Sequence, residues 1–186
     1  MQMIQRRQLL ESIRQELQNT KIVYLEAPCG WGKTVLLHQL KSELGEKNCT
    51  FLNESDLEKE QTKEDRIFLV DNLGDWIISD GINRLKDLID KMPPGCRFVL
   101  AGRIPLPSLL FPYKMTSQIR IYDKERLKFT RQESEALYSI CSDRLSQDEW
   151  IDLYEICRGM QLFLTMAQNL LEETMHDEHE IFRPML

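Results

Sequence analysis

"EAPCGWGKTVLLHQL" (residues 26–40) joins a short apolar run to an amphipathic segment, and this junction decides the fold that the sequence predicts. The preceding run "KIVYLEA" is β-branched and aromatic, which predicts a buried strand. Residues 33–44 place apolar side chains at helical spacing, which predicts a helix that Gly45 ends. A strand, a glycine-rich loop and a helix in this order are the context that the phosphate-binding pattern G-x-x-x-x-G-K-[ST] requires.

The loop carries the groups that a phosphate needs, although Ala27 replaces the first glycine of the pattern. Gly30 and Gly32 can adopt positive φ, which lets consecutive backbone N–H groups point into one anion-sized hollow. Lys33 can reach the β- and γ-phosphates, the Thr34 hydroxyl can ligate Mg²⁺, and the helix adds its positive end. The alternative, a glycine turn with an exposed lysine, fits this context less well. We therefore predict a phosphate site formed by Ala27, Pro28, Cys29, Gly30, Trp31, Gly32, Lys33, Thr34 and Val35; residues 27–34 are called the phosphate loop below.

Two further apolar runs end in polar residues. "IFLVDN" predicts a buried strand that ends at Asp71, whose carboxylate at the carboxyl edge of a parallel sheet could hold Mg²⁺ or its waters. "RFVLAGR" has the same pattern, a predicted strand followed by a polar residue, here Arg103. The Arg103 guanidinium could contact the γ-phosphate and report which nucleotide is bound. The alternatives are a turn aspartate, since Asp-Asn-Leu-Gly is good turn chemistry, and a surface arginine after a strand.

The remaining pattern predicts an α/β fold followed by an all-helical segment. Helices are predicted over 3–19 and 76–91, and further strands at "CTFLN" and "QIRIY". Strands that alternate with helices or connectors predict a parallel sheet sandwiched by helices. After residue 125 the strand pattern stops, and three helices are expected, the first with Thr130 and Glu133 at capping-box spacing. We predict domains at 1–124 and 125–186.

The composition limits the classes of function. With 42% hydrophobic and 29% charged residues the chain is typical of globular proteins. The formal net charge of −6 and the lack of a basic stripe argue against direct DNA binding by this segment. No apolar run is long enough to span a membrane, no signal peptide is recognised, and the five scattered cysteines include no C-x-x-C pair. A cytoplasmic protein without membrane partners is expected.

Four motifs in order resemble one family. "YLEAPCGWGKTVLL" is similar to the A-P-x-G-x-G-K-T loop of the STAND ATPases at the N-terminus of large LuxR-type, maltose-activator-like bacterial transcriptional regulators. "VLAGRIPLPSLL" resembles the family's strand-arginine-proline segment, "ERLKFTRQESEALY" its L-x-F-T-x-x-E-A stretch, and "YEICRGMQLFLTMAQNLL" its helix with a G-W-P turn. The resemblance covers about Arg6 to Leu171.

The resemblance implies an ASCE-type P-loop NTPase fold, a helical lid, and ATP or ADP with Mg²⁺ as ligands. It implies that Lys33 and Thr34 contact phosphate and Mg²⁺, and that Asp71, as the Walker B acid, also holds the metal. It further implies that Arg103 is a sensor and that Arg6, in "RRQL", lies near the adenine. Family members switch between an ADP-bound monomer and an ATP-bound oligomer, so self-association or contacts with other domains of a full-length regulator are expected. The helix-turn-helix through which they bind DNA is not recognisable here, so we expect this sequence to be the beginning of a longer protein.

The sequence departs from the family pattern at the second Walker B acid, where Asn72 follows Asp71. An amide can hold the attacking water but cannot accept its proton, so slow hydrolysis is expected. Asp75 lies three residues beyond Asn72 and could replace the missing acid only if the chain turned sharply. The G-W-P turn also differs, since the sequence has Gly159, Met160 and Gln161 there.

The sequence favours a regulatory ATP/ADP switch over two alternatives. A small P-loop phosphotransferase, such as a nucleotide or metabolite kinase, usually has an arginine-rich lid, whereas the helical tail here has few arginines. A domain that kept the fold but lost the nucleotide is at odds with the intact Gly32-Lys33-Thr34.

Overall fold

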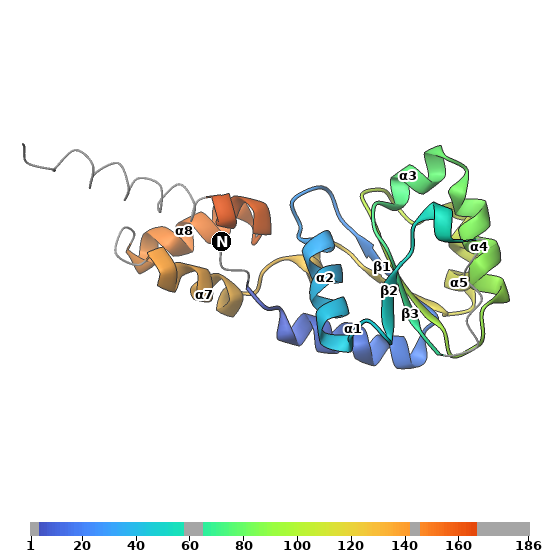
Figure 1. The fold of residues 1–186 in the computed structure, drawn as a ribbon. Helices are drawn as coiled ribbons and strands as arrows, with labels where there is room; N and C mark the ends of the chain where they lie inside the picture. The colour runs from blue at the N-terminus through green and yellow to red at the C-terminus, as the bar shows by residue number, and fades with distance from the viewer. Residues whose placement is uncertain (1–3, 58–64, 142–145, 167–186) are drawn as a thin grey trace, which may run out of the picture. The chain divides into compact units, whose positions relative to one another are not determined.

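The computed structural model describes residues 4–57, 65–141 and 146–166. The chain divides into two compact units, one from Gln5 to Leu127 and one that joins Met1–Ile4 to Lys128–Leu186. The predicted boundary after residue 124 lies close to this division. Figure 1 follows the chain through both units.

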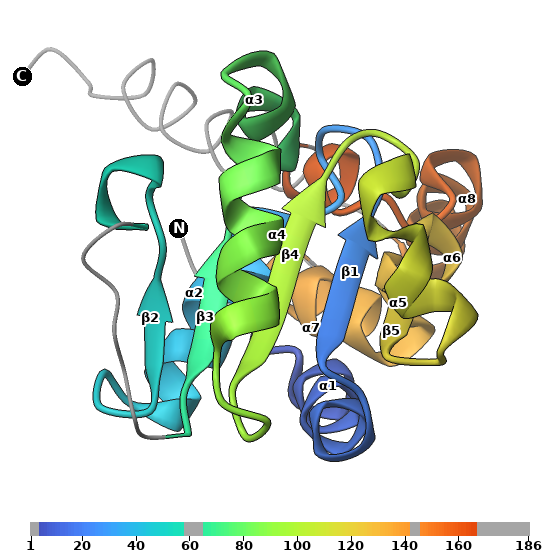
Figure 2. The same ribbon diagram turned by 90° about the vertical axis from the view of Figure 1, so that its right-hand side faces the viewer.

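The first unit is built on a five-stranded sheet in which every paired strand is parallel. The strands lie in the order β2-β3-β4-β1-β5, as Figure 2 shows from the side of α4. Their bounds are β1 Ile22–Glu26, β2 Cys49–Phe51, β3 Ile67–Val70, β4 Arg97–Gly102 and β5 Ile119–Tyr122. Because β4 lies between β1 and β3, the phosphate loop and Asp71 follow strands that do not pair. The carboxyl ends of all five strands therefore meet at one edge.

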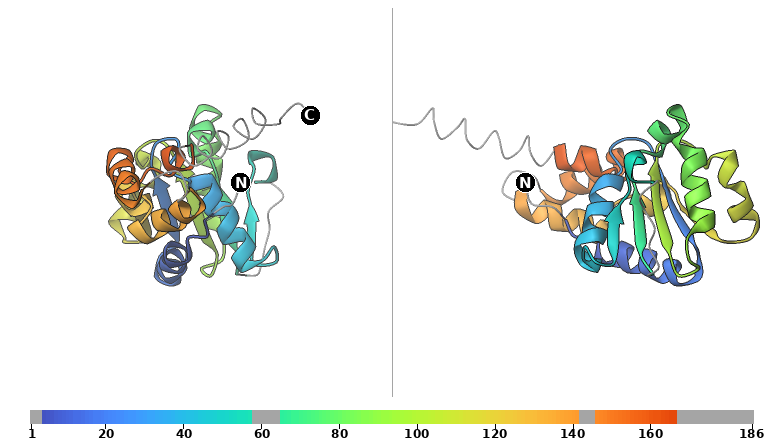
Figure 3. Two further views of the ribbon diagram at one scale, coloured as in Figure 1. Left: turned by 90° about the vertical axis from the view of Figure 1, so that its left-hand side faces the viewer. Right: turned by 45° about the vertical axis from the view of Figure 1, so that its right-hand side comes forward.

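Helices cover both faces of the sheet (Figures 1 and 3). Because side chains on both faces are buried, the strands are almost continuously apolar. On one face, Val23 and Leu25 of β1 pack with the helices that flank the strand in sequence. On the other face, Ile22 and Tyr24 belong to the cluster that α3 and α4 complete. The helices are α1 Arg7–Asn19, α2 Lys33–Leu44, α3 Leu73–Ile78, α4 Gly81–Lys91, α5 Phe111–Met115 and α6 Lys124–Leu127, with 3₁₀ turns η1 Glu54–Asp56 and η2 Ser108–Leu110. None of the helices in the described ranges is long and apolar enough to cross a bilayer.

The single helix predicted over 76–91 is wrong, because two helices occupy this region. Asp80 adopts the left-handed conformation (φ 62°) between α3 and α4, and the Ser79 hydroxyl donates to the Asp75 carbonyl at the end of α3. Gly81 opens α4 against the carboxylate of Glu54, whose Cδ would lie 2.6 Å from a Cβ at this position. The break therefore lets η1 pack close to the start of α4.

The second unit contains the predicted capped helix and a second capped helix that was predicted without its cap. In α7, Arg131–Cys141, the Thr130 hydroxyl accepts from the Glu133 N–H, and the Glu133 carboxylate accepts from the Thr130 N–H, so the predicted capping box forms. In α8, Gln147–Cys157, Ser146 and Glu149 form a second one. Residues 161–166 are also helical, and the rest of the helix predicted from residue 160 onward lies outside the described residues. The core of this unit is formed by Phe129, Leu137, Trp150 and Leu164.

Candidate nucleotide-binding site

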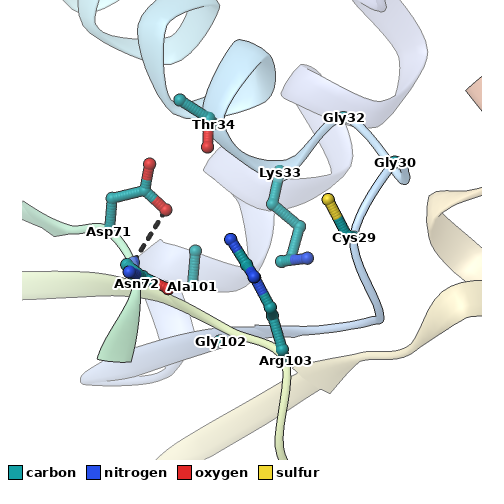
Figure 4. A pocket seen from close by; sticks show the side chains of 10 residues that line it. All are labelled: Cys29, Gly30, Gly32, Lys33, Thr34, Asp71, Asn72, Ala101, Gly102 and Arg103. Atoms are coloured by element: carbon teal, nitrogen blue, oxygen red, sulfur yellow. Dashed lines mark hydrogen bonds between the residues drawn. The ribbon is translucent and has the colours of Figure 1, made fainter. Parts of the chain in front are cut away.

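A pocket of about 250 Å³ lies at the carboxyl edge of the sheet, where the segments after β1, β3 and β4 meet (Figure 4). The three polar groups predicted from separate strand ends, Lys33, Asp71 and Arg103, all line it. Its lining consists of Cys29, Gly30, Gly32, Lys33, Thr34, Asp71, Asn72, Ala101, Gly102 and Arg103. The sequence analysis did not single out Ala101 or Gly102, which bring the backbone of β4 to the floor of the pocket.

The phosphate loop adopts the backbone conformation that its glycines allow. Gly30 and Gly32 have φ values of 86° and 71°, a region that disfavours residues with a Cβ. Gly32 is also the N-cap of α2, which begins at Lys33 as predicted. The positive end of α2 is therefore adjacent to the pocket and favours an anion there.

The Lys33 side chain is folded over its own loop. Only 9% of this residue is exposed, and its ammonium group donates to the carbonyls of Ala27 and Pro28, the latter at 2.7 Å. Burial, and then the positive charge of Arg103, lower the pKa of Lys33, whereas Cys29 and Asp71 act in the opposite direction. A lysine that is buried among carbonyls gains favourable charge interactions when a phosphate enters the pocket.

A compact hydrogen-bonded turn follows β3. The Asp71 carboxylate accepts from the Asn72 N–H at 2.8 Å, and Asn72 lies in the left-handed region with φ 52°. The Asn72 side-chain amide donates to the carboxylate of Asp75, and the Asp75 N–H donates to the Asn72 carbonyl at 2.9 Å. The chain thus makes the sharp turn that brings Asp75 back, but Asp75 contacts Asn72 and does not line the pocket.

Arg103 is the first residue after β4, and its exposed side chain points into the pocket, between the Asp71–Asn72 turn and Lys33 (Figure 4). Within the described ranges, no hydrogen bond or ion pair holds its guanidinium. This group is therefore available to an anion that enters the pocket.

The pocket offers oxygen ligands that suit Mg²⁺. The Thr34 hydroxyl and the Asp71 carboxylate both lie on the same side of the pocket in Figure 4. Magnesium is usually bound in such sites by one or two protein oxygens together with the phosphates of a nucleotide. These two residues therefore fit a nucleotide-bound Mg²⁺, which would offset the negative charge of the phosphates. Among the described residues there is no separate cluster of three or more His, Cys, Asp or Glu side chains that could hold a metal.

Some residues predicted to bind the nucleotide do not line this pocket. Ala27 and Pro28 act through their carbonyls, which hold Lys33, and Val35 lies in the first turn of α2. Trp31 is half-buried and packs on the core between the sheet and helices α1 and α2. Arg6 is only 2% exposed, and its guanidinium donates to the Leu127 carbonyl at 2.7 Å. A role of Arg6 near the adenine remains a prediction.

Comparisons with known proteins bear on the fold. No protein-family profile matches the chain, and no curated protein matches it. Among solved structures, a Walker-type ATPase of Pyrococcus abyssi matches with a TM-score of 0.58 and 10% sequence identity, over 97% of this chain and 76% of that one. A RuvB variant of Thermotoga maritima matches with a TM-score of 0.48 and 18% identity, over 89% of this chain and 61% of RuvB, so this chain spans about three fifths of that protein. The parallel sheet, its strand order and the likeness to the Pyrococcus protein give this chain the α/β fold of the P-loop NTPases.

Proposed function

We propose that this chain is a nucleotide switch, an ATP/ADP-binding module of the STAND class that serves a LuxR-type transcriptional regulator and hydrolyses ATP slowly. The observation that carries the proposal is the meeting of Lys33, Asp71 and Arg103 in one pocket beside the N-terminus of α2. These groups supply a cation for the β- and γ-phosphates, an oxygen ligand for Mg²⁺, and a second cation at the opposite wall.

The two cations distinguish the roles of binding and sensing. Lys33 belongs to the phosphate loop, and of its two proposed contacts the one with the β-phosphate is common to ATP and ADP. Arg103 enters from the end of β4 and points between the Asp71–Asn72 turn and Lys33. Its proposed role is to contact the additional γ-phosphate of ATP. A contact that only ATP can make shifts the populations of two conformations, which is the requirement for a switch.

Slow hydrolysis follows from the side chains around the pocket. Asp71 is the one carboxylate among the lining residues, and its proposed role is to hold the metal. Asn72 cannot accept a proton from the attacking water, and Asp75 is engaged with the Asn72 amide. The nucleotide state would then persist long enough to be read by other domains.

The assignment to a transcriptional regulator rests on the four sequence motifs in family order. The net charge of −6 supports a module that does not itself grip DNA. Self-association or contacts with other domains would transmit the nucleotide state. The domain content of the full polypeptide tests this part, since helical repeats and a helix-turn-helix in it support the assignment and their absence contradicts it.

Calorimetry with Mg²⁺ and either ATP or ADP tests the binding function. Lys33→Ala should weaken the binding of both nucleotides by about 10- to 150-fold, because a charge-assisted contact to the β-phosphate, which ATP and ADP share, is removed. Lys91→Ala is the matched control, since Lys91 is an exposed lysine at the end of α4 and should have no effect. Equal affinities for wild type and Lys33→Ala would contradict the proposal. Turnover above about one per second, or transfer of the γ-phosphate to a small acceptor, would indicate an enzyme instead.

A further inference from the structure

Tyr24 connects the strand before the phosphate loop to the segment that carries Arg103. In the parallel register of β1 with β4, Tyr24 lies opposite Leu100, two residues before the end of both strands. Its ring is fully buried, and its hydroxyl donates to the carbonyl of Ile104 at 2.6 Å, a contact between residues 80 apart in sequence. This bond holds the chain immediately after Arg103.

Gly102 makes room for the same hydroxyl. A Cβ at this position would lie 2.3 Å from the Tyr24 oxygen and 3.1 Å from its Cζ. The φ angle of Gly102 is not in the positive region, so its backbone does not require glycine. The lack of space does require glycine, because the Tyr24 oxygen occupies the place where a side chain of residue 102 would lie. Tyr24 and Gly102 therefore form one fitted contact.

Arg103 lies between two anchors that both come from the region of β1. On its N-terminal side, the Gly102 carbonyl accepts from the N–H of Ala27, the first residue of the phosphate loop, at 3.2 Å. On its C-terminal side, the Ile104 carbonyl accepts from Tyr24. The backbone from which Arg103 reaches into the pocket is thus fixed by the strand that leads into the phosphate loop.

We infer that Tyr24 is a positioning residue that sets the reach of Arg103 and thereby the preference of the site for ATP over ADP. The inference rests on the proposed sensor role of Arg103. Because no described residue holds the guanidinium, its position depends on the backbone at residues 102–104. Burial raises the pKa of Tyr24, so the phenol remains protonated and donates to Ile104 across the neutral range.

A double-mutant cycle tests the inference, with Kd values for ATP and ADP measured for wild type, Tyr24→Phe, Arg103→Ala and the double variant. Tyr24→Phe should lower the ATP-to-ADP preference by about three- to tenfold, the range of one neutral hydrogen bond. In the Arg103→Ala background, Tyr24→Phe should cause no further loss of preference. Tyr122→Phe is the matched control, since Tyr122 is also buried in the sheet and its hydroxyl bonds the Ser12 hydroxyl at 2.7 Å. It should lower the Tm but leave the preference unchanged.

The outcomes separate this inference from the proposed function. If Tyr24→Phe weakens ATP and ADP equally, or if its effect persists in the Arg103→Ala background, Tyr24 only supports the fold and the inference is wrong. If Arg103→Ala changes the preference and Tyr24→Phe does not, the sensor role survives and the positioning role fails. If Arg103→Ala leaves the preference unchanged, both fail.

A second pair of variants tests the fitted contact through stability alone. Gly102→Ala should lower the Tm, because the new methyl group collides with the Tyr24 oxygen. Adding Tyr24→Phe to Gly102→Ala should recover part of that loss, since the nearest atom is then the ring carbon. A double variant that is less stable than Gly102→Ala would show that the hydroxyl does not occupy the space beside residue 102, and the inference would be overturned.

Discussion

The turns after β1 and β3 have similar backbones and different chemistry. Each follows a buried parallel strand and enters a helix through an N-cap residue with positive φ, 71° at Gly32 and 52° at Asn72. At the first turn, the residue that follows the cap is Lys33, a cation that lines the pocket. At the second turn, the N-cap residue Asn72 itself carries an amide, which donates a hydrogen bond to the Asp75 carboxylate. The same backbone conformation thus places a cation in the pocket at one strand end and orients a polar side chain at the other.

Under the proposed function, this difference separates binding from hydrolysis. The first turn has the features of a phosphate site, although Ala27 replaces a glycine. The second has Asp71, and it has an amide at the position proposed for the general base. We therefore expect changes at the second turn to alter turnover and changes at the first to alter affinity.

The largest effect should come from exchanging the amide and the carboxylate at the second turn. The Asn72→Asp/Asp75→Asn double variant keeps one hydrogen bond between these residues and places a proton acceptor at residue 72. Its single-turnover rate should rise by about 10²-fold or more, within the range of general-base catalysis. Quench-flow or a phosphate-release assay would measure it.

The single variants are the controls for this exchange. Asn72→Asp alone puts two carboxylates together, so one of their pKa values should rise and the gain should be smaller. Asp75→Asn alone should leave hydrolysis slow. If wild-type hydrolysis is fast and Asp75→Asn abolishes it, then Asp75 is the acid that assists hydrolysis. The assignment of residue 72 as the position of the missing second acid is then wrong.

Arg103→Ala should weaken the binding of ATP more than that of ADP, because only ATP has a γ-phosphate. A charge-assisted hydrogen bond contributes about 1.5–3 kcal/mol, so ATP affinity should fall by about 10- to 150-fold and ADP affinity by much less. Arg120→Ala is the control, since Arg120 is an exposed arginine of β5 that pairs with Glu16. Equal losses for both nucleotides would leave Arg103 without a sensor role.

The pH dependence of ADP binding should report the charge of Lys33. Its pKa is lowered by burial and by Arg103, so the ammonium group loses its proton at a lower pH than an ordinary lysine. Because the protonated form binds phosphate, affinity should fall by about tenfold per pH unit above that pKa. Titrations from about pH 7 to about pH 10 would measure the decline.

Two variants identify the groups behind this decline. Arg103→Ala removes a cause of the lowered pKa, so the decline should move to higher pH. Asp71 faces Lys33 from the turn after β3, and Cys29 faces it from the same loop; both act to raise the pKa of Lys33, and Cys29→Ser separates the contribution of the thiol. An affinity that does not change over the range would exclude Lys33 as the titrating contact.

The smallest effects concern the two positive-φ caps. Gly32→Ala introduces a Cβ in the left-handed region and should lower the free energy of unfolding by about 1–2 kcal/mol. Asn72→Gly should have little effect on stability, because glycine adopts this conformation without strain. Denaturant unfolding would measure both. A neutral Gly32→Ala would mean that the first cap does not depend on glycine.

Local patterns were sufficient to predict the elements that form the site. The loop motif predicted the start of α2 at Lys33, and the apolar runs predicted the strand ends that carry Asp71 and Arg103. These features depend on the preferences of neighbouring residues, which a single sequence contains. The parallel arrangement then followed from the alternation of strands and helices.

Contacts between distant residues could not be predicted in this way. The Tyr24 hydroxyl meets Ile104 across 80 residues, and the Arg6 guanidinium meets Leu127 across 121. At the break between α3 and α4, Gly81 packs against Glu54, which comes from another segment. Helix α5 was not predicted because three prolines, at positions 105, 107 and 112, interrupt the local pattern. In each case tertiary packing decides a structure that local propensity leaves open.

The left-handed backbone at residue 72 also restricts how this site can evolve. Asparagine and aspartate are the side-chain-bearing residues that accept this conformation most readily, whereas glutamate is strained there. Their codons differ by one nucleotide. If Asn72→Asp alone raises turnover, a lineage could pass between a long-lived and a short-lived nucleotide state by a point mutation, with the backbone of the turn unchanged. The lifetime of the nucleotide state would then be an inherited property that can change independently of the affinity for the nucleotide.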